Sequence, residues 1–385
     1  MKQKPIVLFK PKFRVNEVLN KLRPILKLGW TGIGYKTTEF ENEWSKFTGL
    51  KNSLFLNSAT AGLDLAVQVF KKNNKWNDTS EIICPAISFV SSSNAILYSN
   101  LNVRFCDTDE NGCLDPNDVL KNINKKTKAI IYVGLGGSSN NLSKIIKISK
   151  KYKIKLILDA AHMSGAKMDD GQKIGLQSDV TVFSFQAVKN LPTSDSGMVC
   201  FKSDKDSKLA RQLSWCGIDS DTFLRNNRAF NINRSWVYEV KHLGYKYNGN
   251  SVNAVIGSLG LKYLNKDNKR RNEISRIYDA NIHHSIKKVK HSKNSSRHLY
   301  QILVENRDDL FGYLKKNNIY CGVHYQSLLN YALYKKNSKV KKSKNLTLSN
   351  FFSKSAISLP MHVYLTNRDV LRVCETINKF ILLKN

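Results

Sequence analysis

Two residues that could do chemistry follow apolar segments, at points where a strand gives way to a turn. Asp159 ends the segment KLILD (155–159), and Lys189 lies just beyond DVTVFSF (179–185), before a cluster of Asn, Pro, Thr, Ser, Asp and Gly. Reactive groups of α/β proteins gather at such strand ends. A lysine becomes a nucleophile toward carbonyl carbons when burial or nearby cations lower its pKa. Considered singly, Asp159 is also explained as a turn or helix N-cap residue, and Lys189 as a solvated lysine.

A third feature, the segment NSATAGL (57–63), follows a strand and opens a helix. Its first-turn N–H groups suit a phosphate, although a plain helix cap would have the same sequence. Together the three features are the parts that pyridoxal 5′-phosphate (PLP) requires: a phosphate site, a lysine for the Schiff base and a carboxylate that keeps the pyridine nitrogen protonated. Ser184 could donate to the same phosphate. Phe89 could stack on the ring or serve as an ordinary core aromatic.

Short apolar runs alternate with helical patterns from about residue 50 to residue 201. The expected strands are 53–56, 81–85, 102–107, 129–135, 155–162, 179–185 and 197–201. Between them lie amphipathic helices, one of which begins with Asp115 as N-cap and Pro116 as first helical residue. Repeated β-α-β units with short connections predict a mostly parallel sheet, covered by helices on both faces, with its ligand at the carboxyl ends of the strands.

The pattern changes after about residue 250 and predicts a smaller α+β unit. Residues 251–264 are typical of a buried helix, and residues 266–289 of a long polar helix. The final helix starts at Thr366, whose spacing to Asp369 resembles a capping box. The basic run 335–345 is expected to form a surface loop.

The charge of the chain has two interpretations. Lys and Arg number 62 against 30 Asp and Glu, which gives a formal charge of +32. Nucleic-acid binding would explain this excess, but the lysines are scattered and do not alternate with aromatic residues. We therefore favour a solvated lysine-rich surface that helps to attract an anionic substrate such as a nucleotide diphosphate, and we expect no specific nucleic-acid partner.

Cysteine spacing and hydropathy set further bounds. The seven cysteines contain no C-x-x-C pair, so neither a disulfide framework nor a metal site is expected. The N-terminal apolar run is only four residues long, too short for a signal peptide, and no stretch approaches the roughly 18 apolar residues that span a bilayer. These features predict a soluble, cytoplasmic protein without a membrane partner.

Five motifs occur in the order seen in a known family. The motifs are NSATAGL, CPAISFVSSSNAI, LDAAH, SFQAVKNLPTSDSGMV and GYKYNGNSVNAVIG. In these motifs the chain resembles the DegT-type sugar aminotransferases, from about Gly29 through the final helix, and the block around Lys189 is the most specific part. The resemblance implies the PLP-dependent transferase fold type I, with a mainly parallel seven-stranded sheet and a smaller α+β C-terminal domain. It implies a segment 1–30 packed with the small domain, a PLP-binding domain 31–250 and a small domain 251–385.

The resemblance also assigns roles to residues. It implies that Lys189 holds the cofactor and carries the proton, that Asp159 pairs with the pyridine nitrogen and that His162, where many members have Gln, donates to the phenolic oxygen. The residues implied for the phosphate and the ring face are Ser58, Thr60, the backbone N–H of Ala61, Ser184 and Phe89.

The chain departs from the family at two motifs. The usual GYNYR is GYKYN here, so that Lys246 stands where an asparagine reaches the phosphate of the neighbouring subunit's PLP. The HLYG-like turn is GLGG here, with Gly134 in place of His. Arg297, His298 and His324 are candidate substrate residues, although structural histidines and a surface arginine would fit the same sequence.

The resemblance implies a homodimer with shared active sites. The implied reaction moves an amino group from L-glutamate, through pyridoxamine phosphate (PMP), to a nucleoside-diphosphate keto-(6-deoxy)hexose for amino-sugar and surface-glycan biosynthesis. One alternative is a deoxygenase of the same family, in which a histidine replaces the lysine. A second alternative is a non-catalytic PLP-binding regulator. The presence of both Asp159 and Lys189 favours aminotransfer over both alternatives.

Overall fold

The large sheet is the scaffold of the protein. The computed structural model of the chain describes residues 4–219 and 238–383. In the described chain this sheet has the order β1-β7-β6-β5-β4-β2-β3-β10, and within it only β7 runs opposite to the other strands. The strands are β1 (Ser53–Leu56), β2 (Glu81–Pro85), β3 (Asn102–Cys106), β4 (Thr127–Val133), β5 (Lys155–Asp159), β6 (Val180–Ser184), β7 (Gly197–Phe201) and β10 (Val340–Lys342). The predicted α/β class with a mainly parallel sheet is confirmed.

The sheet has eight strands instead of the expected seven. The additional strand, β10, lies within the basic run 335–345, for which a loop was predicted wrongly, and it pairs in parallel with the edge strand β3. Backbone hydrogen bonds hold it: Val103 N–H donates to Lys339 O (3.0 Å) and Ser343 N–H to Phe105 O (2.8 Å). A three-residue strand with two exposed lysines has no apolar periodicity, so the sequence pattern could not reveal it. Charged residues of this kind also protect a sheet edge from further pairing.

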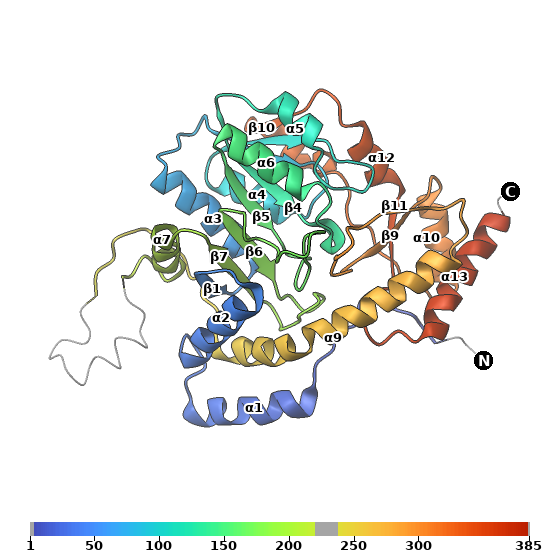
Figure 1. Cartoon of the computed structure of the whole chain (residues 1–385), viewed down its shortest axis with the longest axis horizontal. Helices are drawn as coiled ribbons and strands as arrows, with labels where there is room; N and C mark the ends of the chain where they lie inside the picture. Colours follow the sequence, from blue (N-terminus) through green and yellow to red (C-terminus); the bar gives the residue numbers. More distant parts are fainter. Residues whose placement is uncertain (1–3, 220–237, 384–385) are drawn as a thin grey trace.

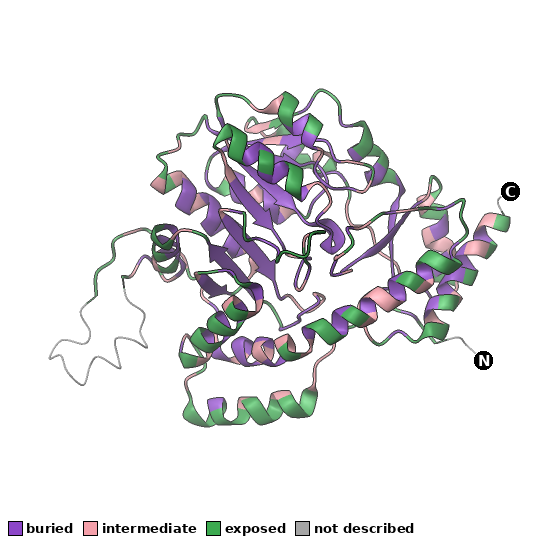
Figure 2. Ribbon diagram, viewed as in Figure 1, coloured by how far each residue is buried: buried purple, intermediate pink, exposed green. Residues whose placement is uncertain are grey.

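Both faces of the sheet are covered, and neighbouring residues of one strand point to opposite faces. Ile82 and Ile131 pack in one apolar cluster, whereas Ile83 and Ile130 pack in the other. One face carries α3 (Ala59–Asn73), α4 (Val90–Tyr98) and α7 (Asp204–Ser214), and the other carries α2 (Tyr35–Thr48), α5 (Pro116–Asn122) and α6 (Leu142–Tyr152). Figure 2 shows the resulting pattern, with a buried sheet and helices exposed on their outer sides.

A single long helix, α9 (Ser251–Asn281), links the large sheet to the smaller unit (Figure 1). Two helices over 251–264 and 266–289 were predicted, but no proline interrupts the segment, and one continuous helix runs from Ser251 to Asn281. The N-terminal helix α1 (Val15–Leu28) packs against α9.

The smaller unit has its own antiparallel sheet and apolar core. Its strands have the order β11-β9-β8, and Ile6 of the N-terminal segment pairs with Ile319 beside it. The elements of this region are β8 (Lys287–Lys288), β9 (Tyr300–Leu303), α10 (Arg307–Lys316), α11 (Ala332–Lys336), α12 (Thr347–Ser355), β11 (Ala356–Leu359) and α13 (Asn367–Leu382). One apolar cluster joins α9, α10, α13 and this sheet.

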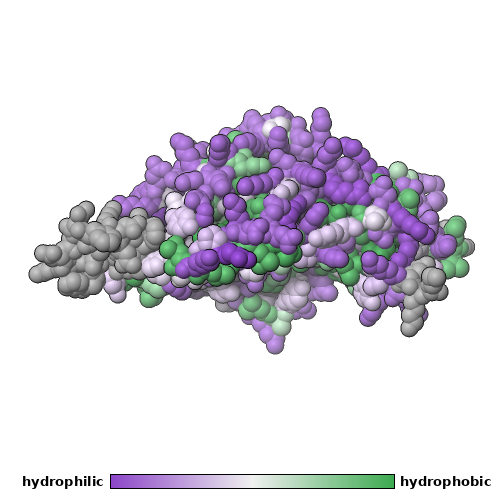
Figure 3. Space-filling view, turned by 90° about the horizontal axis from the view of Figure 1, so that it is seen from below, coloured by the Kyte–Doolittle hydropathy of each residue, from purple (hydrophilic) through white to green (hydrophobic). Residues whose placement is uncertain are grey.

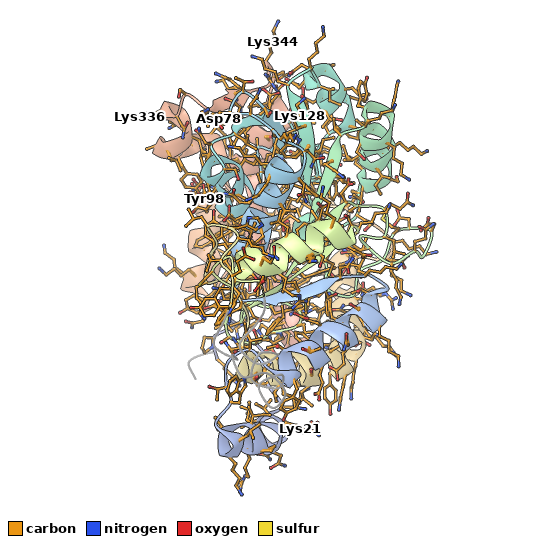
Figure 4. The ribbon with its side chains drawn as sticks, turned by 90° about the vertical axis from the view of Figure 1, so that its left-hand side faces the viewer. Lys21, Asp78, Tyr98, Lys128, Lys336 and Lys344 are labelled. Carbon is orange, nitrogen blue, oxygen red and sulfur yellow. The ribbon has the colours of Figure 1, made fainter. Side chains whose placement is uncertain are left out.

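Charge is spread over the surface. Hydrophilic side chains cover most of the face in Figure 3, and in Figure 4 Lys21 lies at the opposite end of the molecule from Lys128, Lys336 and Lys344. Within the described ranges, no helix is both long and apolar enough to cross a membrane.

The capping box at the start of α13 provides a test of the fold. Thr366 Oγ1 accepts a hydrogen bond from Asp369 N–H (3.1 Å), and Asp369 Oδ2 accepts one from Thr366 N–H (2.9 Å). Because α13 supplies Val370, Val373 and Ile377 to the small core, Thr366→Ala should lower the free energy of unfolding by about 1 kcal/mol, measured by urea denaturation. Thr366→Ser keeps the cap and should match the wild type. Equal stability of the alanine and serine variants would contradict this role.

Candidate active site

A cavity of about 400 Å³ opens at the carboxyl end of the parallel strands, between the large sheet and the smaller unit. Val133, Asp159 and Ser184 bring the ends of β4, β5 and β6 to it, as expected of an open α/β sheet. The predicted site residues that line it are Ser58, Thr60, Phe89, Asp159, His162, Ser184, Lys189, His298 and His324.

Three predicted site residues do not line this cavity. Ala61 lies in α3 one residue beyond Thr60, which does line the cavity, and the Ala61 N–H already donates to Ser58 Oγ (3.1 Å). Lys246 places its Nζ 3.1 Å from the centre of the Trp215 ring, in a cation–π contact. Arg297 has a left-handed backbone (φ 48°), and burial lowers the pKa of its guanidinium, an effect that the nearby carboxylate of Asp279 opposes.

Asp159 is a buried carboxylate with two hydrogen-bond donors. Ser92 Oγ donates to its Oδ2 (2.6 Å), and Ala161 N–H donates to its Oδ1 (3.1 Å). Burial raises the pKa of Asp159, whereas these two donors and the charge of Lys189 act in the opposite direction. Each carboxylate oxygen has a second lone pair, so the group can accept one more donor from the cavity.

The role of Ser92 could not be deduced from the sequence. It is one of three successive serines at the start of α4, and only the fold shows that Ser92 contacts Asp159 while Ser93 donates to Tyr334 OH (2.8 Å). Ser88 Oγ lies 2.8 Å from Ser92 Oγ, so two successive hydroxyl groups lead to the carboxylate of Asp159.

Lys189 projects from a compact turn after β6. Lys189 N–H donates to Gln186 O (2.8 Å), and Thr193 N–H donates to Phe185 O (2.7 Å), so the turn closes on the end of the strand. Burial lowers the pKa of Lys189 to about 8, although the charge of Asp159 raises it. The amine is therefore much closer to its neutral, nucleophilic form at neutral pH than an exposed lysine is.

The N-terminus of α3 and the end of β6 form an anion-binding corner. Ser58 is the N-cap of α3, and Ser184 pairs with Gly197 across β6 and β7. Gly197 lies so close to α3 that a Cβ atom there would be 2.5 Å from Ala59 N, so any larger residue would push the helix N-terminus away. The positive end of the helix dipole and two hydroxyl groups make this corner suited to a phosphate.

The opposite wall is rich in aromatic and imidazole rings. Phe9, from the N-terminal segment, stacks on His298 with ring centres 5.5 Å apart, and Tyr325 OH lies 3.3 Å from His162 Nε2. Phe89 lies 6.1 Å from Tyr325, centre to centre. The sequence did not point to Phe9 or Tyr325, since both reach the cavity through packing of the N-terminal segment and the smaller unit.

The GLGG turn does not line the cavity, and its glycines are required by close packing. A Cβ atom on Gly134 would be 2.0 Å from Met163 Sδ, so Met163 takes up the space of a side chain at that position. Gly136 has φ 64°, and a Cβ atom there would be 2.7 Å from His291 Cε1. The turn therefore contributes its backbone, and Gly136 N–H donates to His162 Nδ1 (3.2 Å).

Comparison with known proteins gives a consistent result. Residues 14–378 match the DegT/DnrJ/EryC1/StrS aminotransferase family. A UDP-4-amino-4,6-dideoxy-N-acetyl-beta-L-altrosamine transaminase from Campylobacter jejuni is 31% identical over 89% of each chain. The structure of Helicobacter pylori PseC, an aminotransferase involved in the biosynthesis of pseudoaminic acid, aligns with a TM-score of 0.88 at 26% identity and covers 98% of this chain and 99% of its own.

A further solved structure is a PLP form, and PLP is the cofactor expected from the sequence of this chain. The protein Spr1654 from Streptococcus pneumoniae, in its PLP form, aligns with a TM-score of 0.85 at 26% identity over 98% of both chains. The family match spans nearly the whole chain and includes every residue of the cavity except Phe9. The chain therefore belongs to the DegT/DnrJ/EryC1/StrS aminotransferase family.

Proposed function

We propose that this protein is a PLP-dependent aminotransferase that moves an amino group from L-glutamate to a nucleoside-diphosphate keto-(6-deoxy)hexose, for amino-sugar and surface-glycan biosynthesis. One observation carries the proposal: in a chain of an aminotransferase family, a half-buried lysine with a lowered pKa (Lys189) and a buried carboxylate (Asp159) share one cavity with a helix N-terminus.

The residues of the cavity fit PLP. Ser58, Thr60 and Ser184 would hold the phosphate at the anion-binding corner, and the free lone pair of Asp159 would accept the N–H of the pyridine nitrogen. That N–H would also bring a positive charge next to Asp159 and so offset the cost of burying the carboxylate. PLP, when bound, supplies an electron sink for the carbanion that forms when a proton leaves the substrate's α-carbon.

Lys189 would hold the cofactor through its amine, and it would also move the proton during the reaction. A pKa near 8 lets its amine take up and release a proton close to neutral pH, as a general acid–base catalyst requires. Phe9 and Tyr325 line the same cavity and add apolar surface near this amine.

The substrate class is supported by the relatives and by the charge of the chain. The C. jejuni relative is a transaminase of a UDP-linked amino sugar, and the net charge of +32 would attract a nucleoside diphosphate. Aromatic rings such as Phe9 and Tyr325 offer surfaces for the C–H face of a hexose, and His324 adds a polar group. The further substrate candidate from the sequence, Arg297, would need a change of side-chain position to contribute.

The proposal includes a homodimer, with Lys246 as the residue that crosses to the neighbouring subunit's phosphate. The Lys246 side chain does not line the cavity of its own chain, in keeping with this role, and an ammonium group is a strong phosphate partner.

The direct test follows the two half-reactions in the visible spectrum. L-Glutamate should abolish the absorbance of the lysine-bound cofactor, and a nucleoside-diphosphate 4-keto-6-deoxyhexose should restore it. Lys189→Ala should lack the absorbance, whereas Lys202→Ala, which alters an exposed lysine after β7, should keep it. No response to glutamate would refute aminotransfer, and no return with any of a panel of keto-sugar nucleotides would refute the substrate class. Formation of a deoxygenated sugar would support the deoxygenase alternative.

Removal of the Ser92 hydroxyl should weaken cofactor binding. A hydrogen bond to a charged group contributes about 1.5–3 kcal/mol, so Ser92→Ala should raise the Kd for PLP by about tenfold or more, measured by absorbance titration of the cofactor-free protein. Ser93→Ala is a matched control, because Ser93 is equally buried and donates to Tyr334 instead. An unchanged Kd in Ser92→Ala would contradict the role of this contact.

The pH dependence of PLP uptake should report the pKa of Lys189. Only the neutral amine attacks the aldehyde, and burial lowers the pKa of Lys189 to about 8, so its neutral fraction rises with pH and levels off above that value. The rate of uptake by the cofactor-free protein, measured by stopped-flow absorbance, should rise roughly tenfold per pH unit below 8 and reach a plateau near pH 9. A rate that still rises beyond pH 10, as for an exposed lysine, would contradict the shift.

A further inference from the structure

The hydrogen bonds around the cavity fix which nitrogen of two histidines carries a proton. His162 and His298 lie side by side, with ring centres 4.3 Å apart, and both rings line the cavity. In a neutral imidazole one nitrogen donates and the other accepts, and the partner of one nitrogen decides the state of the other.

The tautomer of His162 is fixed by a backbone N–H of the GLGG turn (134–137). Gly136 N–H lies 3.2 Å from His162 Nδ1. A peptide N–H can only donate, so Nδ1 must accept and the proton of the neutral ring is on Nε2. His162 therefore presents a donor toward Tyr325 OH and the cavity, the same polarity as the side-chain N–H of a glutamine.

The tautomer of His298 is the opposite one, with the proton on Nδ1, and it is fixed by Asn190, the residue after Lys189. Asn190 Nδ2 lies 2.7 Å from the carbonyl oxygen of Ser296, which can only accept, so the amide orientation is determined. Asn268 Oδ1, at 2.9 Å from Asn190 Nδ2, agrees with this orientation, because Asn268 Nδ2 donates to Ser164 O. Asn190 Oδ1 consequently faces His298 Nδ1 at 3.0 Å and requires a proton there.

We infer that His298 keeps its proton on Nδ1 and presents Nε2 as a hydrogen-bond acceptor to a hydroxyl of the sugar substrate beside its keto carbon. This inference names the recognition chemistry of the proposed function and rests on it. Nε2 lies on the side of the ring away from Asn190 and is the nitrogen left for a ligand, whereas the neighbouring His162 offers a donor. The pair thus presents one acceptor and one donor to the substrate.

A neutral hydroxyl fits His298 better than an ammonium group does. Burial lowers the pKa of the His298 imidazole most, followed by His162 and then by the two cations Lys189 and Arg271. The same positive charges would repel a ligand cation at Nε2, but they leave a hydroxyl donor unaffected.

The tautomers can be observed directly in the wild-type protein. Long-range 1H–15N NMR of histidine-labelled protein distinguishes protonated from unprotonated ring nitrogens, and His298→Asn or His298→Gln, whichever folds, assigns the signal. His298 should show a protonated Nδ1 and an unprotonated Nε2, and His162 the reverse. A proton on Nε2 of His298 would overturn the inference, whether or not the protein is active.

Kinetics then test recognition of the hydroxyl. In His298→Asn the amide nitrogen can still donate to Asn190, but the Nε2 acceptor is gone. The kcat/KM of the keto-sugar half-reaction should therefore fall about tenfold. The kcat/KM of the glutamate half-reaction should stay within about twofold of the wild-type value. The wild type should discriminate about tenfold against a sugar that lacks the hydroxyl beside the keto carbon, and the variant should not.

The outcomes separate the two proposals. Equal discrimination by the wild type and His298→Asn would overturn the hydroxyl contact. His284→Asn, which alters an exposed histidine, should behave as the wild type in every assay. A wild-type protein that fails both half-reactions would refute the proposed function, whereas the NMR result would still decide the tautomer of His298.

Discussion

The rest of the site is arranged around one constraint: the buried carboxylate of Asp159 and the half-buried amine of Lys189 line the same cavity. Burial of single charges is costly, so each must be satisfied within the fold. Ser92 and the Ala161 N–H donate to the carboxylate, and the charge of each group favours the charged form of the other. The two side chains line one cavity because β5 and β6 are parallel neighbours that end at one edge of the sheet.

The second layer of the site is held by backbone groups and by one asparagine. The N–H of Gly136 donates to the His162 ring, and the carbonyl oxygen of Gly136 accepts from the backbone N–H of His298, so the glycine-rich turn contacts both histidine residues. Asn190 connects the lysine turn to α9 through Asn268 and to the smaller unit through His298. The same contacts therefore fix the position of His298 relative to the turn that carries Lys189.

The sequence was sufficient where local pattern decides structure. The apolar runs of β1, β2 and β7 were predicted with their observed bounds, and the convergence of Asp159 and Lys189 followed from the rule for parallel sheets. It was insufficient where pairing is distant in the chain: β10 has no apolar pattern, and Phe9 and Ser92 reach the site only through tertiary packing. The direction of the Lys246 side chain likewise depends on contacts that spacing does not contain.

The most direct measurement is chemical mapping of the residue that binds the cofactor. Borohydride reduction of the PLP-loaded protein, followed by proteolysis and mass spectrometry, converts a lysine–PLP link into a stable mass increase on one peptide. The account predicts that this mass lies on Lys189, within a chain that has dozens of other cationic side chains for comparison. Modification of a different lysine, or a protein with no modified peptide after saturation with PLP, would contradict the account.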